Sequence, residues 1–373
     1  MAIDQEFFHG KKAAAVLKHG ILTRYIPPFV EKTGSTAAQG RVVVLDGYAG
    51  PGEYEDGSPG SPLVMVRSLA RSRRTLDLVL IEQDRATFDR LTKVLKTQGL
   101  SLAHGPYCGR VEDQLDEALQ VACGVPLFAF LDPYGLGITF DDVVGKIFGR
   151  PAGSGSPATE VLLNFSSDAV RRIGGLIANG DNAPGRDKTL ARLDAVVGGD
   201  WWRALYSSAG SPEAASEAIA SRYLEELCSA AKTAGWVAEV RRAPGHQPIY
   251  SLVYLTRHRD GMALFGEALS LAQADWRKAV AKTGTLDDEE FLAEAERTLA
   301  GEWHQEILRN TRRLLAERPS IQLGLAGADV YGAALGYARG THLRKALKEL
   351  YSSGEIVTEP KGDLWKLTVT RGR

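Results

Sequence analysis

The sequence predicts an α/β protein with a parallel sheet that has helices on both faces, followed by a smaller C-terminal domain. Three observations support this. Short runs of β-branched and aromatic residues alternate with amphipathic helical segments, which is typical of strands buried on both faces of a sheet. A glycine-rich turn directly follows the first of these runs. Roughly the last seventy residues change to helical segments followed by a two-stranded ribbon.

Composition excludes several classes of protein. The chain has 373 residues, 45 Lys and Arg against 46 Asp and Glu, and 44% apolar residues, as in a globular protein of two or three domains. No apolar run reaches the ~18 residues of a membrane span, and the N-terminus does not resemble a secretory signal. Cys108, Cys123 and Cys228 have no zinc spacing, so we expect reduced thiols in a cytoplasmic protein without a metal site. The near-zero net charge still allows a local basic face.

The first elements can be placed in order along the chain. We expect an amphipathic helix from Lys11 to Tyr25, ended by Pro27 and Pro28, because proline cannot continue a helix. The expected parallel strands are Val42–Leu45, Leu78–Ile81, a short one near Ser101–His104, Val125–Leu131 and Val161–Phe165. The expected helices between them are Pro62–Ser72, Arg85–Gln98 and Val111–Ala122. Strand, helix and strand at this spacing predict crossover connections and therefore a parallel sheet.

The rest of the α/β domain, which we assign to residues 1–300, contains two additions. Residues 168–234 are helix-prone and indicate a helical insertion. Two further strands, Trp236–Arg242 and Ile249–Thr256, are joined by a short turn and predict an antiparallel hairpin at one edge of the sheet.

Residues 301–373 are expected to form a winged helix. Helices at Glu302–Glu317 and Thr341–Leu350 precede a ribbon made of Gly354–Thr358 and Leu364–Val369. Three basic residues lie at helical spacing on the expected recognition helix, where they would contact the phosphates of a nucleic acid. They are Arg344, Lys345 and Lys348.

The motif that indicates chemistry begins where the first strand ends. Asp46 is followed by Gly47, Gly50 and Gly52, and open α/β sheets bind ligands at this position. The spacing D-x-x-x-G-x-G differs from the dinucleotide fingerprint G-x-G-x-x-G and is typical of S-adenosylmethionine-dependent methyltransferases. The loop continues to Ser61, which we expect to cap the next helix.

Two further acids follow strand ends. Glu82 ends the second strand, where it would accept hydrogen bonds from both ribose hydroxyls of a nucleoside. Asp132, Pro133 and Tyr134 follow the fourth strand, where methyltransferases that act on exocyclic amines of bases carry D/N-P-P-Y/F. Asp132 would bind the amine protons and Tyr134 would stack on the base, although Tyr134 occupies the place of the second proline.

The acid expected after the third strand is harder to assign. In methyltransferases, an acid that follows a glycine after the third strand commonly binds the adenine amine of the cofactor. Here Gly109 is followed by Arg110, so Asp113 or Glu112 would have to take the place of that acid. If Asp132 is not the acceptor of the amine protons, the remaining candidates are Glu112, Asp113 and Asn164.

Three segments, Asp46–Gly52, Glu53–Pro62 and Leu131–Gly135, together resemble the three-Cys-motif partner family (TcmP). The resemblance covers roughly residues 10–260. It implies a Rossmann-like class I methyltransferase sheet, S-adenosylmethionine as cofactor, and a three-cysteine-motif protein as a partner. More distantly, Lys18 and His19 before the glycine loop are similar to the ribosomal-RNA adenine methyltransferases, and this implies that both lie near the cofactor.

Three functions are compatible with these features. The first is a methyltransferase that acts on an exocyclic amine of a DNA or RNA base, with the C-terminal domain presenting the nucleic acid. The second is a non-catalytic methyltransferase-like protein that binds nucleic acid or a three-cysteine-motif protein. The third is another enzyme on a doubly wound sheet, such as a nucleotide-dependent transferase, because the fold alone does not define the reaction.

Overall fold

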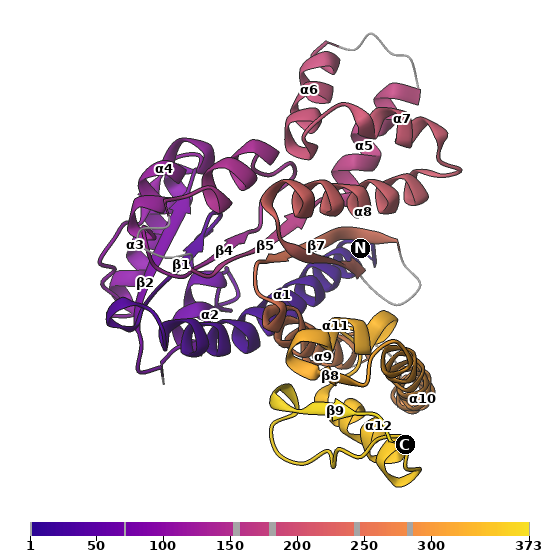
Figure 1. Ribbon diagram of the computed structural model, residues 1–373. Helices are drawn as coiled ribbons and strands as arrows, with labels where there is room; N and C mark the ends of the chain where they lie inside the picture. Colours follow the sequence, from indigo (N-terminus) through magenta and orange to yellow (C-terminus); the bar gives the residue numbers. More distant parts are fainter. Residues whose placement is uncertain are drawn as a thin grey trace. The chain divides into compact units, whose positions relative to one another are not determined.

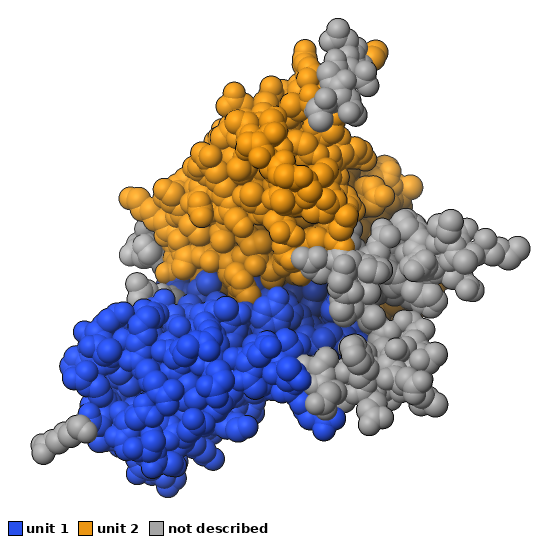
Figure 2. Space-filling model, turned by 90° about the vertical axis from the view of Figure 1, so that its right-hand side faces the viewer, with its two compact units in different colours: residues 1–25, 258–373 blue, residues 26–257 orange. Residues whose placement is uncertain are grey.

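The computed structural model describes residues 2–70, 72–151, 157–178, 184–241, 247–281 and 286–372. The chain divides into two compact units (Figure 2). One consists of residues 26–257, and the other combines residues 1–25 with residues 258–373. Within the described ranges, no helix has both the length and the apolar character that crossing a membrane requires.

The unit of residues 26–257 is built on a seven-stranded sheet in the order β3-β2-β1-β4-β5-β7-β6 (Figure 1). The parallel strands are β1 (Arg41–Asp46), β2 (Thr75–Glu82), β3 (Tyr107–Cys108), β4 (Leu127–Leu131) and β5 (Thr159–Phe165). The hairpin of β6 (Ala234–Arg241) and β7 (Pro248–Thr256) is antiparallel, and β7 pairs with β5. The predicted Rossmann-like sheet and its edge hairpin are therefore confirmed.

Helices cover the sheet and form the insertion (Figure 1). Those between the strands are α2 (Ser61–Ser68), α3 (Arg85–Thr97), α4 (Val111–Val121) and the π-helix η2 (Asp142–Phe148). The predicted insertion consists of α5 (Ser167–Ala178), α6 (Arg186–Val197), α7 (Trp201–Ser208) and α8 (Pro212–Ala231). The insertion follows β5, so its helices reach the carboxyl ends of the strands, where ligands bind in open sheets.

Alternate residues of the central strands pack on opposite faces, as strands buried on both sides require. Val43 and Leu45 of β1 belong to a core cluster that includes α4, η2 and α8. Val44 points to the other face, where Phe128 of β4 contacts Phe29 with ring centroids 5.7 Å apart. This double burial explains why the strands appear in the sequence as continuous apolar runs.

The prediction that Pro27 and Pro28 end the first helix is wrong, because α1 runs from Ala2 to Gly34 through both prolines. Proline inside a helix costs about 3 kcal/mol or more. Ile26, Phe29 and Val30, which flank the prolines, are buried, and each buried apolar side chain contributes about 1.5–3 kcal/mol. Burial of this segment therefore offsets the cost of the prolines.

The third strand is also displaced from its predicted place near Ser101–His104. The strand β3 has two residues and pairs with the end of β2. Tyr107 lies opposite Ile81, and Cys108 lies opposite Glu82. Because so short a strand has no run of β-branched residues, its position depends on pairing and not on local propensity.

The second compact unit contains the C-terminal helices. Its elements are α9 (Arg259–Ala281), α10 (Leu286–Glu317), β8 (Ser320–Gln322), α11 (Leu323–Tyr331), α12 (Gly340–Ser352) and β9 (Thr368–Thr370). The start of α1 belongs here, since Arg24 forms an ion pair of 2.5 Å with Asp275 and Tyr25 packs edge-on against Phe265. The compact units divide at residue 257, and the predicted domain boundary at residue 300 stays a prediction.

The expected ribbon of Gly354–Thr358 and Leu364–Val369 is only partly formed. Leu364–Lys366 is a 3-10 turn, because the Asp363 carboxylate accepts a hydrogen bond from the Trp365 N–H and caps it. The strand β9 starts after this turn and pairs with β8, which the sequence did not predict. The first half of the expected ribbon contributes a single bridge, between Ile356 and Arg371.

Candidate functional site

The side chain of Asp46 is fully buried at the end of β1. Its carboxylate accepts hydrogen bonds from the Tyr48 N–H (3.1 Å) and the Ser61 hydroxyl (2.6 Å). Burial, only partly offset by these hydrogen bonds, raises the pKa of Asp46 to about 7, and the negative charges of Asp132 and Glu82 add to the effect. Three acids from three neighbouring strands are therefore brought together, as their places at strand ends predicted.

Ser61 has a different role from the one we expected. The residue that caps α2 is Gly60, and Ser61 is already helical. Its hydroxyl is thus available for Asp46, fifteen residues earlier in the chain. The capping prediction is wrong because a buried carboxylate without enough hydrogen bonds is costly, and the Ser61 hydroxyl supplies one of the hydrogen bonds that Asp46 accepts.

The three glycines of the loop serve different purposes. Gly47 and Gly52 are needed for packing, because a Cβ at Gly47 would lie 2.8 Å from Leu131 and one at Gly52 would lie 3.0 Å from Leu91. Gly50 has a φ of +64°, and no described atom beyond its chain neighbours lies within 4 Å of the place a Cβ would take. Gly50 is therefore where the loop offers open space beside its backbone.

Glu82, at the end of β2, holds the glycine loop Gly47–Gly52 in place through a hydrogen bond. Its carboxylate accepts hydrogen bonds from the Gly50 N–H (2.9 Å) and the Asp84 N–H (2.8 Å), one on each oxygen. Each carboxylate oxygen has two lone pairs, so both oxygens can accept a further hydrogen bond. This capacity, next to the open space at Gly50, fits a pair of vicinal hydroxyls.

Asp132 lies at the carboxyl end of β4, and Asn164 lies at the end of the neighbouring strand β5. The Asn164 amide donates a hydrogen bond of 2.7 Å to Oδ1 of Asp132. Asn164 is 9% exposed, and its Oδ1 has no hydrogen-bond partner among the described residues. From the sequence, Asn164 was only an alternative to Asp132. It is, however, the one polar residue in the apolar run Val161–Phe165, and this feature was a signal that could have identified it.

A narrow, mainly apolar slot lies beside this pair, with room for about one water molecule. Its lining residues come from the ends of β4 and β5, the loop after β4, α6 and α8. They are Leu131, Pro133, Gly135, Leu136, Gly137, Ile138, Leu163, Asn164, Phe165, Ser166, Val196 and Tyr223. Pro133 therefore lines the slot, whereas the Tyr134 side chain is fully exposed and is not part of the lining.

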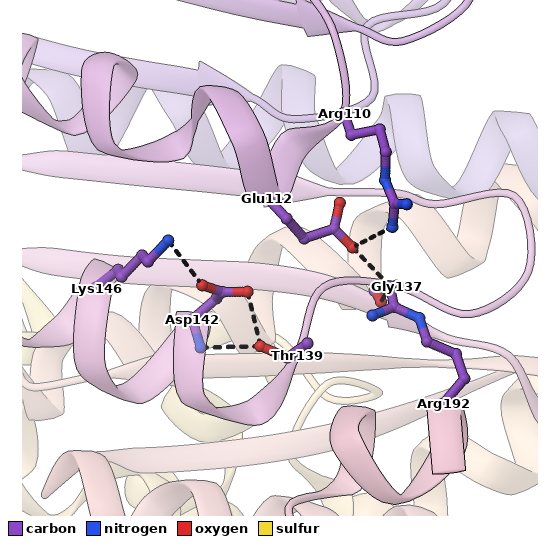
Figure 3. A network of polar contacts seen from close by, with 7 residues as sticks. All are labelled: Arg110, Glu112, Gly137, Thr139, Asp142, Lys146 and Arg192. Carbon is purple, nitrogen blue, oxygen red and sulfur yellow. Dashed lines mark hydrogen bonds and ion pairs between the residues drawn. The ribbon is translucent and has the colours of Figure 1, made fainter. Parts of the chain in front are cut away.

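A polar network fixes one wall of the slot (Figure 3). Arg192 from α6 forms an ion pair of 2.6 Å with Glu112 of α4 and donates a 2.8 Å hydrogen bond to the Gly137 carbonyl. Arg110 also contacts Glu112, at 3.3 Å. Burial of the Glu112 carboxylate acts to raise its pKa. Hydrogen bonds from the Glu112 backbone N–H, from Arg192 and from Arg110 outweigh burial, so the pKa of Glu112 lies below its ordinary value. Glu112 thus orders the loop after β4 through Arg192.

Thr139 and Asp142 form a second group at the start of the π-helix (Figure 3). The Thr139 hydroxyl donates a 2.7 Å hydrogen bond to Asp142, and Lys146 pairs with the same carboxylate at 3.1 Å. Together with the hydrogen bond from Arg192 to Gly137, these contacts fix the second half of the loop between β4 and the π-helix.

The remaining predicted site residues lie elsewhere. Asp113 is exposed in the first turn of α4, where its backbone N–H bonds to the Arg110 carbonyl. Lys18 and His19 belong to the compact unit that contains the C-terminal helices, so their place near a cofactor stays a prediction. Within the described ranges, no group of three or more His, Cys, Asp or Glu side chains could hold a metal ion.

The basic residues of α12 differ in their contacts. Arg344 donates hydrogen bonds to the Pro360 carbonyl (2.6 Å) and the Gly362 carbonyl (2.8 Å), so it anchors the turn that precedes β9. Lys345 and Lys348 are exposed on the same helix. Two of the three residues are therefore presented to solvent, while the third has a structural role.

No family model matches the chain, and no curated protein matches it either. Several solved structures are similar to it. The O-methyltransferase TomG from Streptomyces achromogenes, in complex with SAM, is 14% identical over 66% of this chain and 89% of that chain, with a TM-score of 0.32. The plantazolicin methyltransferase BamL, in complex with SAH, is 10% identical over 69% and 91%, with a TM-score of 0.35. TYW2 of M. jannaschii, in complex with AdoMet, is 11% identical over 61% and 72%, with a TM-score of 0.27.

Proposed function

We propose that the protein is an S-adenosylmethionine-dependent methyltransferase that acts on an exocyclic amine of a nucleic-acid base. The observation that carries the proposal is the convergence of Asp46, Glu82 and Asp132 at the carboxyl ends of three adjacent strands, beside the open backbone of Gly50. Ligands of open α/β sheets bind at this edge, and the strand order turns in opposite directions on either side of β1.

The residues present fit the proposed cofactor. S-adenosylmethionine carries two ribose hydroxyls, a sulfonium and an ammonium group. Glu82 keeps an acceptor site on each oxygen for the hydroxyls. The buried negative charge of Asp46 is unfavourable without a cation, as its raised pKa of about 7 indicates, and a positively charged ligand would offset it. When bound, the cofactor supplies an electrophilic methyl group.

The chain's own residues would prepare the acceptor amine. The lone pair of a base amine is delocalised into the ring, which makes the nitrogen a poor nucleophile. Asp132 would accept hydrogen bonds from the amine protons and so favour the pyramidal, reactive nitrogen, an interaction that strengthens in the transition state. The exposed ring of Tyr134 would stack on the base outside the slot, which admits only a small group.

Calorimetric titration with S-adenosylhomocysteine tests the cofactor site, and transfer of a labelled methyl group to total DNA and total RNA tests the activity. We expect saturable binding by the wild type and weaker binding by Glu82→Ala. Asp84→Asn is the matched control, because Asp84 follows the same strand but its side chain caps α3. Absence of binding by the wild type would contradict the proposal.

We propose further that residues 301–373 form a winged helix that contacts the nucleic acid. The elements α10, β8, α11, α12 and β9 follow the order helix, strand, helix, helix and strand, and β9 also bridges to Ile356. Lys345 and Lys348 are exposed on α12 and would contact phosphates. Loss of nucleic-acid affinity in the variant with both lysines replaced by alanine tests this proposal.

The alternative is a non-catalytic protein that binds nucleic acid or a three-cysteine-motif protein. The small size of the slot beside Asp132 favours it, because a whole base cannot enter. This alternative predicts that the wild type transfers no methyl group to any DNA or RNA, whether or not it binds S-adenosylhomocysteine. The transfer assay therefore separates the two functions.

A further inference from the structure

We infer that the exposed side of α3 is a contact surface for the phosphates of a nucleic acid. We call its three residues, Arg90, Lys93 and Lys96, the α3 basic face. The inference rests on the proposed function, because it takes a nucleic acid as the substrate. It goes beyond that function because it assigns part of the binding to the unit of residues 26–257, in addition to the basic residues of α12.

The charges of the α3 basic face are not neutralised within the helix. All three side chains are exposed, and none forms an ion pair with a residue that the structure describes. The one acid of α3, Asp89, lies 3.2 Å from the Nε of Arg85, so these two residues neutralise each other. The helix therefore presents three positive charges that a polyanion can pair with.

The α3 basic face follows one side of its helix. Its positions recur at every third residue, which places them within about 120° around the helix axis and about 9 Å along it. Leu91 and Leu95, on the opposite side of the helix, are buried. Lys and Arg side chains are long, so a row of three at this spacing can reach neighbouring phosphates of one strand.

The buried side of α3 packs against the glycine loop of the proposed cofactor site. A Cβ at Gly52 would lie 3.0 Å from Leu91 and 3.3 Å from Val94, so the helix and the loop are in close contact. The helix begins directly after the carboxyl end of β2, where Glu82 lies, and runs back along the sheet. A strand that follows the α3 basic face can therefore lead to the sheet edge that carries the site.

The opposite face of the sheet has the opposite charge. Its helix α4 contains four acids and no basic residue, and Asp116 and Glu117 are exposed. α4 packs in the same core cluster as Leu45 of β1, whereas Leu91 of α3 is buried outside that cluster. The net charge of −1 is therefore unevenly distributed, and the field of the protein directs a polyanion to the α3 side.

An anionic membrane also attracts basic helices, but the composition of α3 favours a nucleic acid. A helix that lies on a membrane carries large apolar side chains beside its basic residues. The exposed large apolar side chains of the described residues all lie outside α3. The exposed side of α3 has threonines instead, and their hydroxyls bond to carbonyls of the helix itself. Phosphates of a nucleic acid need only the charges.

The test is the salt dependence of affinity for a fluorescein-labelled single strand of mixed sequence, as DNA and as RNA, measured by fluorescence anisotropy. The variant carries Arg90→Gln, Lys93→Gln and Lys96→Gln, because glutamine is a good helix former of similar length. We expect the salt slope to flatten by about two units, at about 0.7 per phosphate contact with a single strand. At low salt the affinity should fall about tenfold or more.

Two control variants separate the α3 basic face from general effects of charge. Arg85→Gln with Asp89→Asn removes the ion pair of the same helix and leaves the net charge unchanged. Asp116→Asn with Glu117→Gln makes the net charge more positive on α4. We expect both controls to keep the salt slope of the wild type. An unchanged midpoint of thermal unfolding establishes that each variant is folded.

The transfer assay gives a second readout. The triple variant should have a raised KM for the nucleic acid and a nearly unchanged kcat, because phosphate contacts are the same in the ground state and the transition state. A lowered kcat with an unchanged KM would contradict a role in binding.

The outcomes distinguish this inference from the proposed function. Equal salt slopes in the triple variant and the wild type would overturn the inference, as would a steeper slope in the Asp116→Asn, Glu117→Gln control. Loss of binding to phosphatidylserine vesicles in the triple variant, with an unchanged slope for nucleic acid, would identify a membrane contact instead. Failure of the wild type to bind any DNA or RNA overturns the proposed function itself.

Discussion

Replacing Asp46 by asparagine should stabilise the protein at neutral and alkaline pH but not at acidic pH. Burial raises the pKa of Asp46 from 3.8 to about 7. Between these values the folded state holds a proton that the unfolded state has released, so the free energy of unfolding falls as the pH rises. The stability that the protonated group contributes is complete below about pH 4 and is lost progressively up to about pH 7.

The size of the effect follows from the shift. At about 1.4 kcal/mol per pKa unit, the wild type loses on the order of 4 kcal/mol of stability from this group between pH 4 and pH 8. Asparagine does not titrate, so Asp46→Asn escapes this loss. Between pH 5 and pH 8, the free energy of unfolding of the variant, relative to the wild type, should rise by about 3 kcal/mol. A hydrogen bond lost from Tyr48 or Ser61 shifts the whole curve by about 1 kcal/mol without changing its slope.

Urea unfolding of both proteins at a series of pH values between 5 and 8 measures this difference. The matched control is Asp84→Asn. The hydrogen bond that its carboxylate accepts from Thr87 lowers the pKa of Asp84, so folded and unfolded states are both ionised over this range and no slope is expected. A difference between Asp46→Asn and the wild type that stays constant from pH 5 to pH 8 would refute the reasoning.

The remaining predictions concern function. Glu82→Ala should lower the affinity for S-adenosylhomocysteine about ten- to a hundredfold in calorimetry, since hydrogen bonds to a charged group are worth ~1.5–3 kcal/mol; an unchanged affinity would remove Glu82 from the site. Asp132→Ala should reduce methyl transfer ~10²-fold with nearly unchanged cofactor affinity, and full turnover would show that the amine acceptor lies elsewhere. Lys345→Ala with Lys348→Ala should flatten the salt dependence of nucleic-acid affinity by about two units of slope. Lys361→Ala is the control, because Lys361 is paired with Glu359, and equal slopes in the double variant and the wild type would exclude α12 as the contact surface.

The positions of the strands and of the acids that follow them were predictable from the sequence. Strands buried on both faces must be continuous apolar runs, so β1, β2, β4 and β5 were marked by composition alone. A polar residue directly after such a run lies at the edge of the sheet. The places of Asp46, Glu82 and Asp132 therefore followed from local sequence, before any contact between them was known.

Elements whose conformation depends on distant partners were mispredicted. The prolines of α1 are tolerated because the residues around them are buried, which local propensity does not register. Ser61 had the sequence of a helix cap, but the buried carboxylate of Asp46 takes its hydroxyl. In each case a tertiary contact outweighed a local preference of a few kcal/mol.

The sequence by itself thus determined where β1, β2, β4 and β5 form, that acids follow three of these strands, and that a glycine turn opens beside the first. Only the tertiary structure decided which of these side chains meet. Asn164 and Asp132 are 32 residues apart, and they pair because β5 lies next to β4 in the sheet. The link from Glu112 through Arg192 to Gly137 likewise needs the insertion to pack beside α4. Local sequence restricts backbone conformation over a few residues, whereas strand order and burial bring distant residues together.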